Sequence, residues 1–273
     1  MMSGVSFGQY YPSGSLLHKL DPRIKIILTV LYIVCTFICK NLISYAILLL
    51  SAILLVIIGR VPFRIILKGL KGVLFVLAFT AILNVFWTKG ENRLCEWKFI
   101  SIYVEGLYAA LFIMIRITVL IIGTGMLLTY TTTPIALTNA IEDLLSPLKK
   151  LHVPVHSFAM MMTIALRFIP TLTEETERIM TAQKARGADF TSGGLIKRAK
   201  ALIPVLIPLF VSAFNRAGDL AVAMECRCYN GGDGRTRMNV RKIRFVDFIP
   251  LVLIIAFGAG LITLNIFGIG YTA

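Results

Sequence analysis

Long apolar runs separated by short polar or basic segments make up most of the chain. Five of these runs predict membrane spans, because a helix that crosses the hydrocarbon core needs about 20 predominantly apolar residues. They cover residues 24–39, 42–58, 72–87, 105–128 and 246–267. The first two are short for spans, but they fit a helical hairpin closed by a tight turn at Lys40-Asn41. The pattern therefore predicts an all-α, polytopic membrane protein. Asp21 and Pro22 precede the first run as an N-cap residue and a first helical residue.

A different pattern fills residues 129–245. A short helix is predicted from Pro134 to about Leu151. Apolar residues then recur every three or four positions over residues 155–187 and again over 195–227, which indicates two long helices with one apolar stripe each. At 1.5 Å per residue, each would reach roughly 45 Å. The predicted division is residues 1–128 with the N-terminal segment and four spans, residues 129–245 with the long helices, and residues 246–273 with the last span.

Prolines lie within both long helices. Pro170 falls in the first helix, and Pro204 and Pro208 fall in the second. Each proline removes a backbone donor and clashes with the preceding turn, so these positions are predicted to bend and to act as hinges. The segments 154–172 and 201–214 are also apolar enough for either to be a sixth span.

Both long helices end in an arginine between small side chains. The first ends at Ala185-Arg186-Gly187 and the second at Cys226-Arg227-Cys228. A guanidinium group stays charged and holds five donors in a fixed fork, which suits a pocket of carbonyls and carboxylates on another protein. The helix dipole alone would explain one arginine at a helix end. Two arginines in matching contexts predict docking to a partner.

The apolar stripes predict a second partner surface. Two long helices cannot both hide an apolar stripe in water, so they must cross each other, lie against the membrane or cover a third protein. Methionine-rich helices can repack against different partners. The positions predicted to touch such a partner are Met161, Met162, Leu206 and Phe210.

Composition and charge agree with a membrane location. The chain is 57% hydrophobic and 15% charged, with a mean hydropathy of +0.82. Its net charge is +14, and 16 of its 28 lysines and arginines lie between residues 129 and 244. The positive-inside rule explains this distribution without nucleic acid. It predicts a multi-pass protein of the cell membrane, with the N-terminus and the long helices in the cytoplasm. The segment from Met1 to Lys19 lacks the apolar core of a cleavable signal.

Candidate chemistry within the chain is sparse. Cys226 and Cys228 offer only two metal ligands, and no nearby cluster completes a tetrahedral site. The sequence has no phosphate-binding loop of the G-x-x-x-x-G-K-[ST] type and no H-E-x-x-H motif. No catalytic, cofactor-binding or metal-binding residue is therefore predicted. Arg116 lies inside the fourth run and should face protein or water, because arginine at membrane depth costs at least about 2–3 kcal/mol.

Three segments together resemble the transmembrane energy-coupling component, or T component, of energy-coupling factor (ECF) transporters for vitamins and metal ions. The N-terminal segment is Gly8-Gln9-Tyr10 with Leu17-His18-Lys19-Leu20-Asp21-Pro22-Arg23-Ile24-Lys25. The arginine segments are Gln183-Lys184-Ala185-Arg186-Gly187-Ala188 and Ala223-Met224-Glu225-Cys226-Arg227-Cys228-Tyr229. The resemblance covers essentially the whole chain. It departs from the family at Cys228, where glycine or another small residue is more usual.

The resemblance implies a complex with two ABC-type ATPase subunits and a small substrate-binding membrane subunit, which could be exchangeable. ATP and Mg²⁺ would be bound by the ATPases. Arg186 and Arg227 would each enter a groove of one ATPase, and the apolar surfaces would hold the substrate-binding subunit. ATP-driven movement would then rotate that subunit and release a vitamin or other micronutrient inside the cell.

Two other classes of function stay open from the sequence. One is a membrane enzyme acting at the inner face on a phosphorylated lipid or isoprenoid, with the basic residues holding phosphate. The other is the permease of a conventional ABC importer, which would contact substrate or a substrate-binding protein itself.

Overall fold

The computed structural model of the chain describes residues 10–87, 93–97, 100–190, 192–231 and 244–267. The chain forms two compact units. The first comprises residues 1–137 and 241–273, and the second comprises residues 138–240. Gly8 and Gln9 of the N-terminal segment lie outside the described residues.

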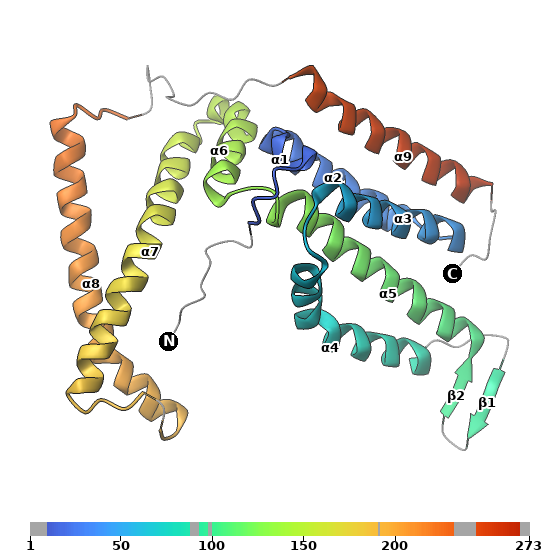
Figure 1. Ribbon diagram of the computed structural model, residues 1–273, viewed down its shortest axis with the longest axis horizontal. Coiled ribbons are helices and arrows are strands. Elements are labelled where there is room, and N and C mark those ends of the chain that lie inside the picture. The colour runs from blue at the N-terminus through green and yellow to red at the C-terminus, as the bar shows by residue number, and fades with distance from the viewer. Residues whose placement is uncertain (1–9, 88–92, 98–99, 191, 232–243, 268–273) are drawn as a thin grey trace. The chain divides into compact units, whose positions relative to one another are not determined.

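Helices dominate the first unit, as an all-α membrane protein requires. They are α1 (Leu16–Lys19), α2 (Pro22–Ile38), α3 (Leu42–Gly59), α4 (Phe63–Trp87), α5 (Val104–Thr124) and α9 (Ile249–Ile266). A π-helical turn, Gly125–Thr129, continues α5, and a 3-10 turn, Phe245–Phe248, precedes α9. In this unit α2 lies between α5 and α9, while α3 and α4 also pack on α5 (Figure 1). The fold class predicted from the apolar runs is confirmed.

Two predictions for the first unit need correction. The third apolar run was expected to begin at residue 72, but α4 begins at Phe63, so the basic residues Arg64, Lys68 and Lys71 lie on its first turns. Long basic side chains can extend from a helix end toward water, so they do not interrupt the helix. No element was predicted between the third and fourth apolar runs, yet an antiparallel hairpin there pairs β1 (Arg93–Trp97) with β2 (Ile100–Tyr103).

Aromatic and small side chains build the core of this unit. The Tyr45 ring stacks on Phe112 with centroids 4.8 Å apart, joining α3 to α5. Gly123 lets α5 approach α2 closely, because a Cβ atom there would lie 2.0 Å from a ring carbon of Tyr32. Asp21 caps α2 by accepting a bond from the Arg23 N–H at 2.9 Å. The helix start predicted from Asp21 and Pro22 is confirmed.

Arg116 of α5 faces protein, as its cost at membrane depth required. Its Nη2 donates to the Cys39 carbonyl oxygen at 3.2 Å and to the Tyr45 hydroxyl. Its guanidinium carbon also lies 5.5 Å from the centre of the Tyr45 ring. Cys39 is the C-cap of α2, so the cation neutralises the negative end of that helix. This placement is that of a structural anchor.

The second unit consists of α6 (Pro134–Leu145, which begins at the end of the first unit), a 3-10 turn (Ser146–Leu151), α7 (Val155–Ala185) and α8 (Leu195–Cys226). Both long helices begin where the three- and four-residue periodicity predicted and end within two residues of the predicted ends. α7 continues through Pro170, and α8 continues through Pro204 and Pro208. A hydrogen bond between the Glu142 Oε1 of α6 and the His156 Nδ1 of α7, 2.9 Å apart, fixes the start of α7.

Six helices of the described residues are long and apolar enough to cross a membrane. They are α3, α4, α5 with its π-helical turn, α7, α8, and α9 with its 3-10 turn. α2 has 17 residues and is shorter than any of the six. The long helices of the second unit thus share the length and composition of the predicted spans, as the apolar segments 154–172 and 201–214 indicated.

Candidate functional site

The end of α7 is a Schellman motif built around Arg186. Arg186 is the C-cap residue, with φ −86° and ψ 6°. The Gly187 N–H donates to the Lys184 carbonyl at 3.0 Å, and the Ala188 N–H donates to the Gln183 carbonyl at 3.0 Å. This pair of bonds requires a left-handed residue after the cap, and Gly187 supplies it with φ 88°. The helix therefore stops in one defined geometry, with Arg186 exposed at its end.

The end of α8 repeats this motif around Arg227. Arg227 is the C-cap residue, with φ −93° and ψ 16°. The Cys228 N–H donates to the Glu225 carbonyl at 2.8 Å, and the Tyr229 N–H donates to the Met224 carbonyl at 3.0 Å. Cys228 takes the left-handed position with φ 55°, although it is not glycine. Arg227 is exposed, like Arg186.

The two arginines therefore occupy the same position of the same backbone motif. Their flanking residues also correspond: Ala185 and Cys226 end the helices, and Gly187 and Cys228 reverse the chain. All four flanking residues are exposed. The sequence placed the six residues at two helix ends, and the structure adds that both ends have the same two Schellman hydrogen bonds. What the two ends bind stays a prediction.

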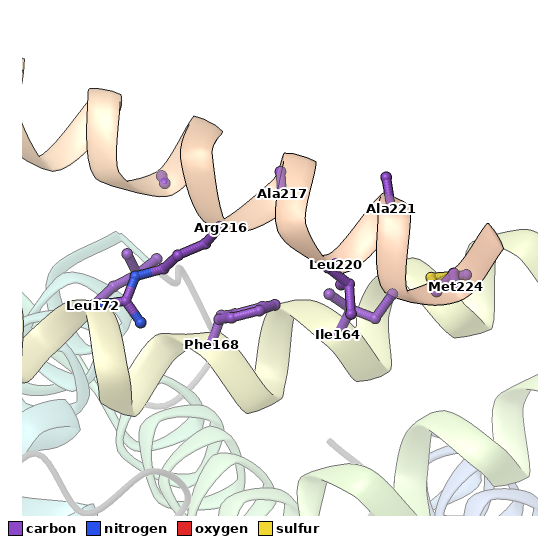
Figure 2. A pocket seen from close by; sticks show the side chains of 9 residues that line it. Ile164, Phe168, Leu172, Arg216, Ala217, Leu220, Ala221 and Met224 are labelled. Atoms are coloured by element: carbon purple, nitrogen blue, oxygen red, sulfur yellow. The ribbon is translucent and has the colours of Figure 1, made fainter. Parts of the chain in front are cut away.

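α7 and α8 pack against each other in antiparallel directions. Figure 2 shows Leu172 and Arg216 at one end of the contact, and Ile164 with Leu220 further along. These side chains line an apolar groove of about 320 Å³ together with Phe168, Ala213, Ala217, Ala221 and Met224. Because the helices are antiparallel, Arg186 and Arg227 lie at opposite ends of the pair.

An ion pair closes one end of this groove. Arg216 Nη2 donates to Glu175 Oε2 at 2.7 Å, and Arg216 Nε donates to the Ser212 hydroxyl at 3.4 Å. The sequence did not predict this contact. Only an alignment of the two long helices by their arginines could have indicated it, because that alignment also pairs residues 175 and 216.

The residues predicted to touch a second partner are all exposed in the chain by itself. The exposed fraction is 59% for Met161, 41% for Met162, 57% for Leu206 and 66% for Phe210. The Phe210 ring also lies against that of Phe214, with centroids 4.8 Å apart. An apolar surface of this kind on α7 and α8 is available to lipid or to another protein.

The way the N-terminal segment is held was also not predictable from the sequence. Lys25 is 2% exposed, and its ammonium donates to the Thr131 carbonyl at 2.9 Å and to the Thr132 hydroxyl at 3.3 Å. The Tyr11 N–H donates to the Tyr130 carbonyl at 3.0 Å. The segment is thus bonded to the turn that follows α5. No periodicity marks a buried lysine, so only the three-dimensional fold reveals it.

The fold defines the class of protein as a polytopic α-helical membrane protein. A family model described as "Cobalt transport protein" (CbiQ) matches residues 13–238. The chain is 54% identical over 252 residues to the energy-coupling factor transporter transmembrane protein EcfT of Ruminiclostridium cellulolyticum, covering 92% of this chain and 93% of the relative. It is 50% identical over 237 residues to EcfT of Bacillus subtilis, covering 87% and 89%. The chain therefore belongs to the family of T components, the membrane subunits of energy-coupling factor transporters.

Proposed function

We propose that this T component couples ATP hydrolysis on two ABC-type ATPase subunits to the movement of a small substrate-binding membrane subunit, for uptake of a vitamin or other micronutrient. In this proposal the chain is not itself an enzyme, and the ATPases bind ATP and Mg²⁺. The N-terminus and the ends of α7 and α8 lie on the cytoplasmic side, where the basic residues concentrate.

The observation that carries the proposal is the match between the two helix ends. Two closely similar cap geometries, each presenting one exposed arginine, suit two copies of one kind of binding groove. A fixed guanidinium fork recognises carbonyl and carboxylate oxygens in such a groove. The docking residues proposed are therefore Ala185, Arg186 and Gly187 at one end, and Cys226, Arg227 and Cys228 at the other.

The antiparallel packing of α7 and α8 supports two ATPases rather than one. Arg186 follows Glu175 by about three helical turns, and Arg227 follows Arg216, the ion-pair partner of Glu175, by the same interval. At 1.5 Å per residue, each arginine is roughly 16 Å from the contact, in opposite directions. A separation of roughly 30–35 Å lets two separate subunits bind at once, and such bivalence raises the overall affinity.

The substrate-binding subunit is proposed to cover the apolar surface that contains Met161, Met162, Leu206 and Phe210. Substrate specificity would then belong to that subunit. Bends at Pro170, Pro204 and Pro208 would let the arginine ends follow the ATPases while the apolar halves move with the substrate-binding subunit.

Purification of the tagged chain from its native membranes tests the proposal. Co-purification of two ATPase subunits and a small membrane protein supports it, and the purified complex should hydrolyse ATP. Recovery of the chain alone, with turnover of a phosphorylated lipid or isoprenoid, would replace the proposal with a membrane enzyme. Direct binding of an extracellular substrate-binding protein would indicate the permease of a conventional importer.

A further inference from the structure

We infer that Glu175 and Arg216 form a register lock between α7 and α8: an ion pair that fixes how far the two helices overlap and hence how far apart Arg186 and Arg227 lie. The lock itself is a property of this chain alone. Its consequence for ATPase docking rests on the proposed function.

The contacts identify this pair as a specific junction between the helices. Arg216 Nη2 and Glu175 Oε2 are 2.7 Å apart, and their side chains are 39% and 23% exposed. Ser212, one turn earlier on α8, holds the Arg216 Nε at 3.4 Å. The arginine is thus oriented from its own helix toward α7, and in Figure 2 it extends from α8 toward Leu172.

Apart from Arg216, the residues that line the surrounding groove are all apolar. It is lined by the small residues Ala213, Ala217 and Ala221 beside Leu220 and Met224 on α8, and by Ile164, Phe168 and Leu172 on α7. Burial of apolar surface is non-directional, so this lining alone defines the register less sharply than a polar contact does. A single polar contact in an apolar helix interface can specify its register. The ion pair is well placed for this role, because a one-turn slide of about 5.4 Å would break it.

Internal symmetry places the ion pair midway between the two arginine ends. Glu175 and Arg216 have the same separation along the chain as Arg186 and Arg227. When one long helix is superimposed on the other by its arginine end, Glu175 and Arg216 therefore take equivalent positions. In a two-fold arrangement, a contact between equivalent positions lies at or near the axis. Both arginine ends are then equally distant from the lock, so any change of register would displace both of them.

The lock can be tested on the full-length chain alone, without ATPases. Spin labels are placed on Cys226 and on the equivalent position by Ala185→Cys, with all other cysteines replaced. The parent protein should give one narrow distance near roughly 30–35 Å, from the helix rise. Glu175→Arg and Arg216→Glu each set two like charges against each other, so each should broaden or shift the distribution. The double swap Glu175→Arg with Arg216→Glu should restore the narrow distance.

Glu174→Arg is the matched control, because it makes the same charge change on an exposed neighbour. It should leave the distance unchanged. The lock is refuted if either single reversal gives the same distance distribution as this control. It is also refuted if the distribution of the double swap is no narrower than those of the single reversals. Restoration by the swap also excludes simple misfolding, because the swapped protein carries both foreign side chains.

The consequence for docking is tested separately, by recovery of ATPase subunits on the tagged chain. Each single reversal should lower recovery roughly 3- to 10-fold, in the lower part of the range for coupling between contacting residues, and the double swap should restore it. If the labelled distances respond as expected but the parent chain binds no ATPase, the lock stands and the proposed function fails. If the parent chain binds ATPases but the charge reversals change neither the labelled distances nor the ATPase recovery, only the lock fails.

Discussion

The ends of α7 and α8 have the same backbone and different residues. Both ends are Schellman motifs with an arginine at the C-cap, but the left-handed residue is Gly187 in one and Cys228 in the other. A side chain in this conformation costs about 1–2 kcal/mol, so the second end keeps its geometry against a local penalty. The position of the arginine is therefore what the two helices share, and glycine is only the easiest way to reach it.

Single arginine variants test whether the two ends are equivalent in function. Arg186→Ala and Arg227→Ala should each weaken ATPase binding by about 30- to 1000-fold, because truncating a central arginine at an interface costs about 2–4 kcal/mol. Titration of the purified chain with ATPase subunits measures this loss. Arg178→Ala, at an exposed position of α7 away from its end, serves as the control and should bind normally. A large loss for one end and none for the other would show that matching geometry does not mean matching function.

The apolar halves of the two helices should differ from their ends in the partner that they bind. Met162→Asp and Phe210→Asp each place a charge in the proposed apolar interface, and each should weaken binding of the substrate-binding subunit at least about tenfold. ATPase binding should be nearly unchanged. Ser157→Asp, at an exposed polar position of α7, is the control. If both partners are lost together, this surface instead holds α7 and α8 against each other.

Exchanging the residue types at Gly187 and Cys228 measures what the left-handed conformation costs at each helix end. Gly187→Cys should destabilise the end of α7 by about 1–2 kcal/mol, and Cys228→Gly should stabilise the end of α8 by a similar amount. A Cβ at residue 187 would meet nothing within 4 Å, so the cost is that of the backbone alone. Hydrogen exchange of the amides in each last turn measures both changes. Gly218→Ala, also in open space but within α8, should slow local exchange instead. Equal rates of amide hydrogen exchange at both helix ends in all variants would show that a side chain at the left-handed position carries no energetic penalty.

The prolines divide unequally between the helices, and the single proline of α7 gives the smallest expected effect. Pro170→Ala should leave assembly intact, because neither the arginine end nor the exposed apolar residues change. If Pro170 is a hinge, ATP hydrolysis should persist while substrate uptake falls by about half or more, since the helix becomes stiffer. Reconstituted vesicles allow both rates to be measured together. Normal uptake at normal protein levels would leave Pro170 as part of a fixed scaffold.

The sequence predicted the helices well because their signals are local. Asp21 and Pro22 mark the start of α2, and the spacing of apolar residues gives the bounds of α7 and α8 within a few residues. The start of α4 was misplaced because Arg64, Lys68 and Lys71 lower the local hydropathy, although they do not break the helix. The hairpin before α5 has strands of only five and four residues, too short for a clear alternating pattern.

The candidate site was predictable only in part. Arg186 and Arg227 stand out in the sequence because glycine or cysteine and small residues surround them. The contact of Glu175 with Arg216 depends on the antiparallel overlap of two helices, which no periodicity records. The burial of Lys25 depends likewise on Thr131, which lies far along the chain. Local patterns identify elements and their ends, while contacts between elements require the fold.

Docking of the ATPases by two equivalent arginine ends is tested by the double variant Arg186→Ala with Arg227→Ala. The measurement is recovery of ATPase subunits on the tagged variant, purified from membranes at the same protein level as the parent chain. We predict that the variant inserts normally and keeps the substrate-binding subunit, but recovers no ATPase and supports no uptake. Full recovery of both ATPase subunits on this variant would contradict a docking role for the two arginines.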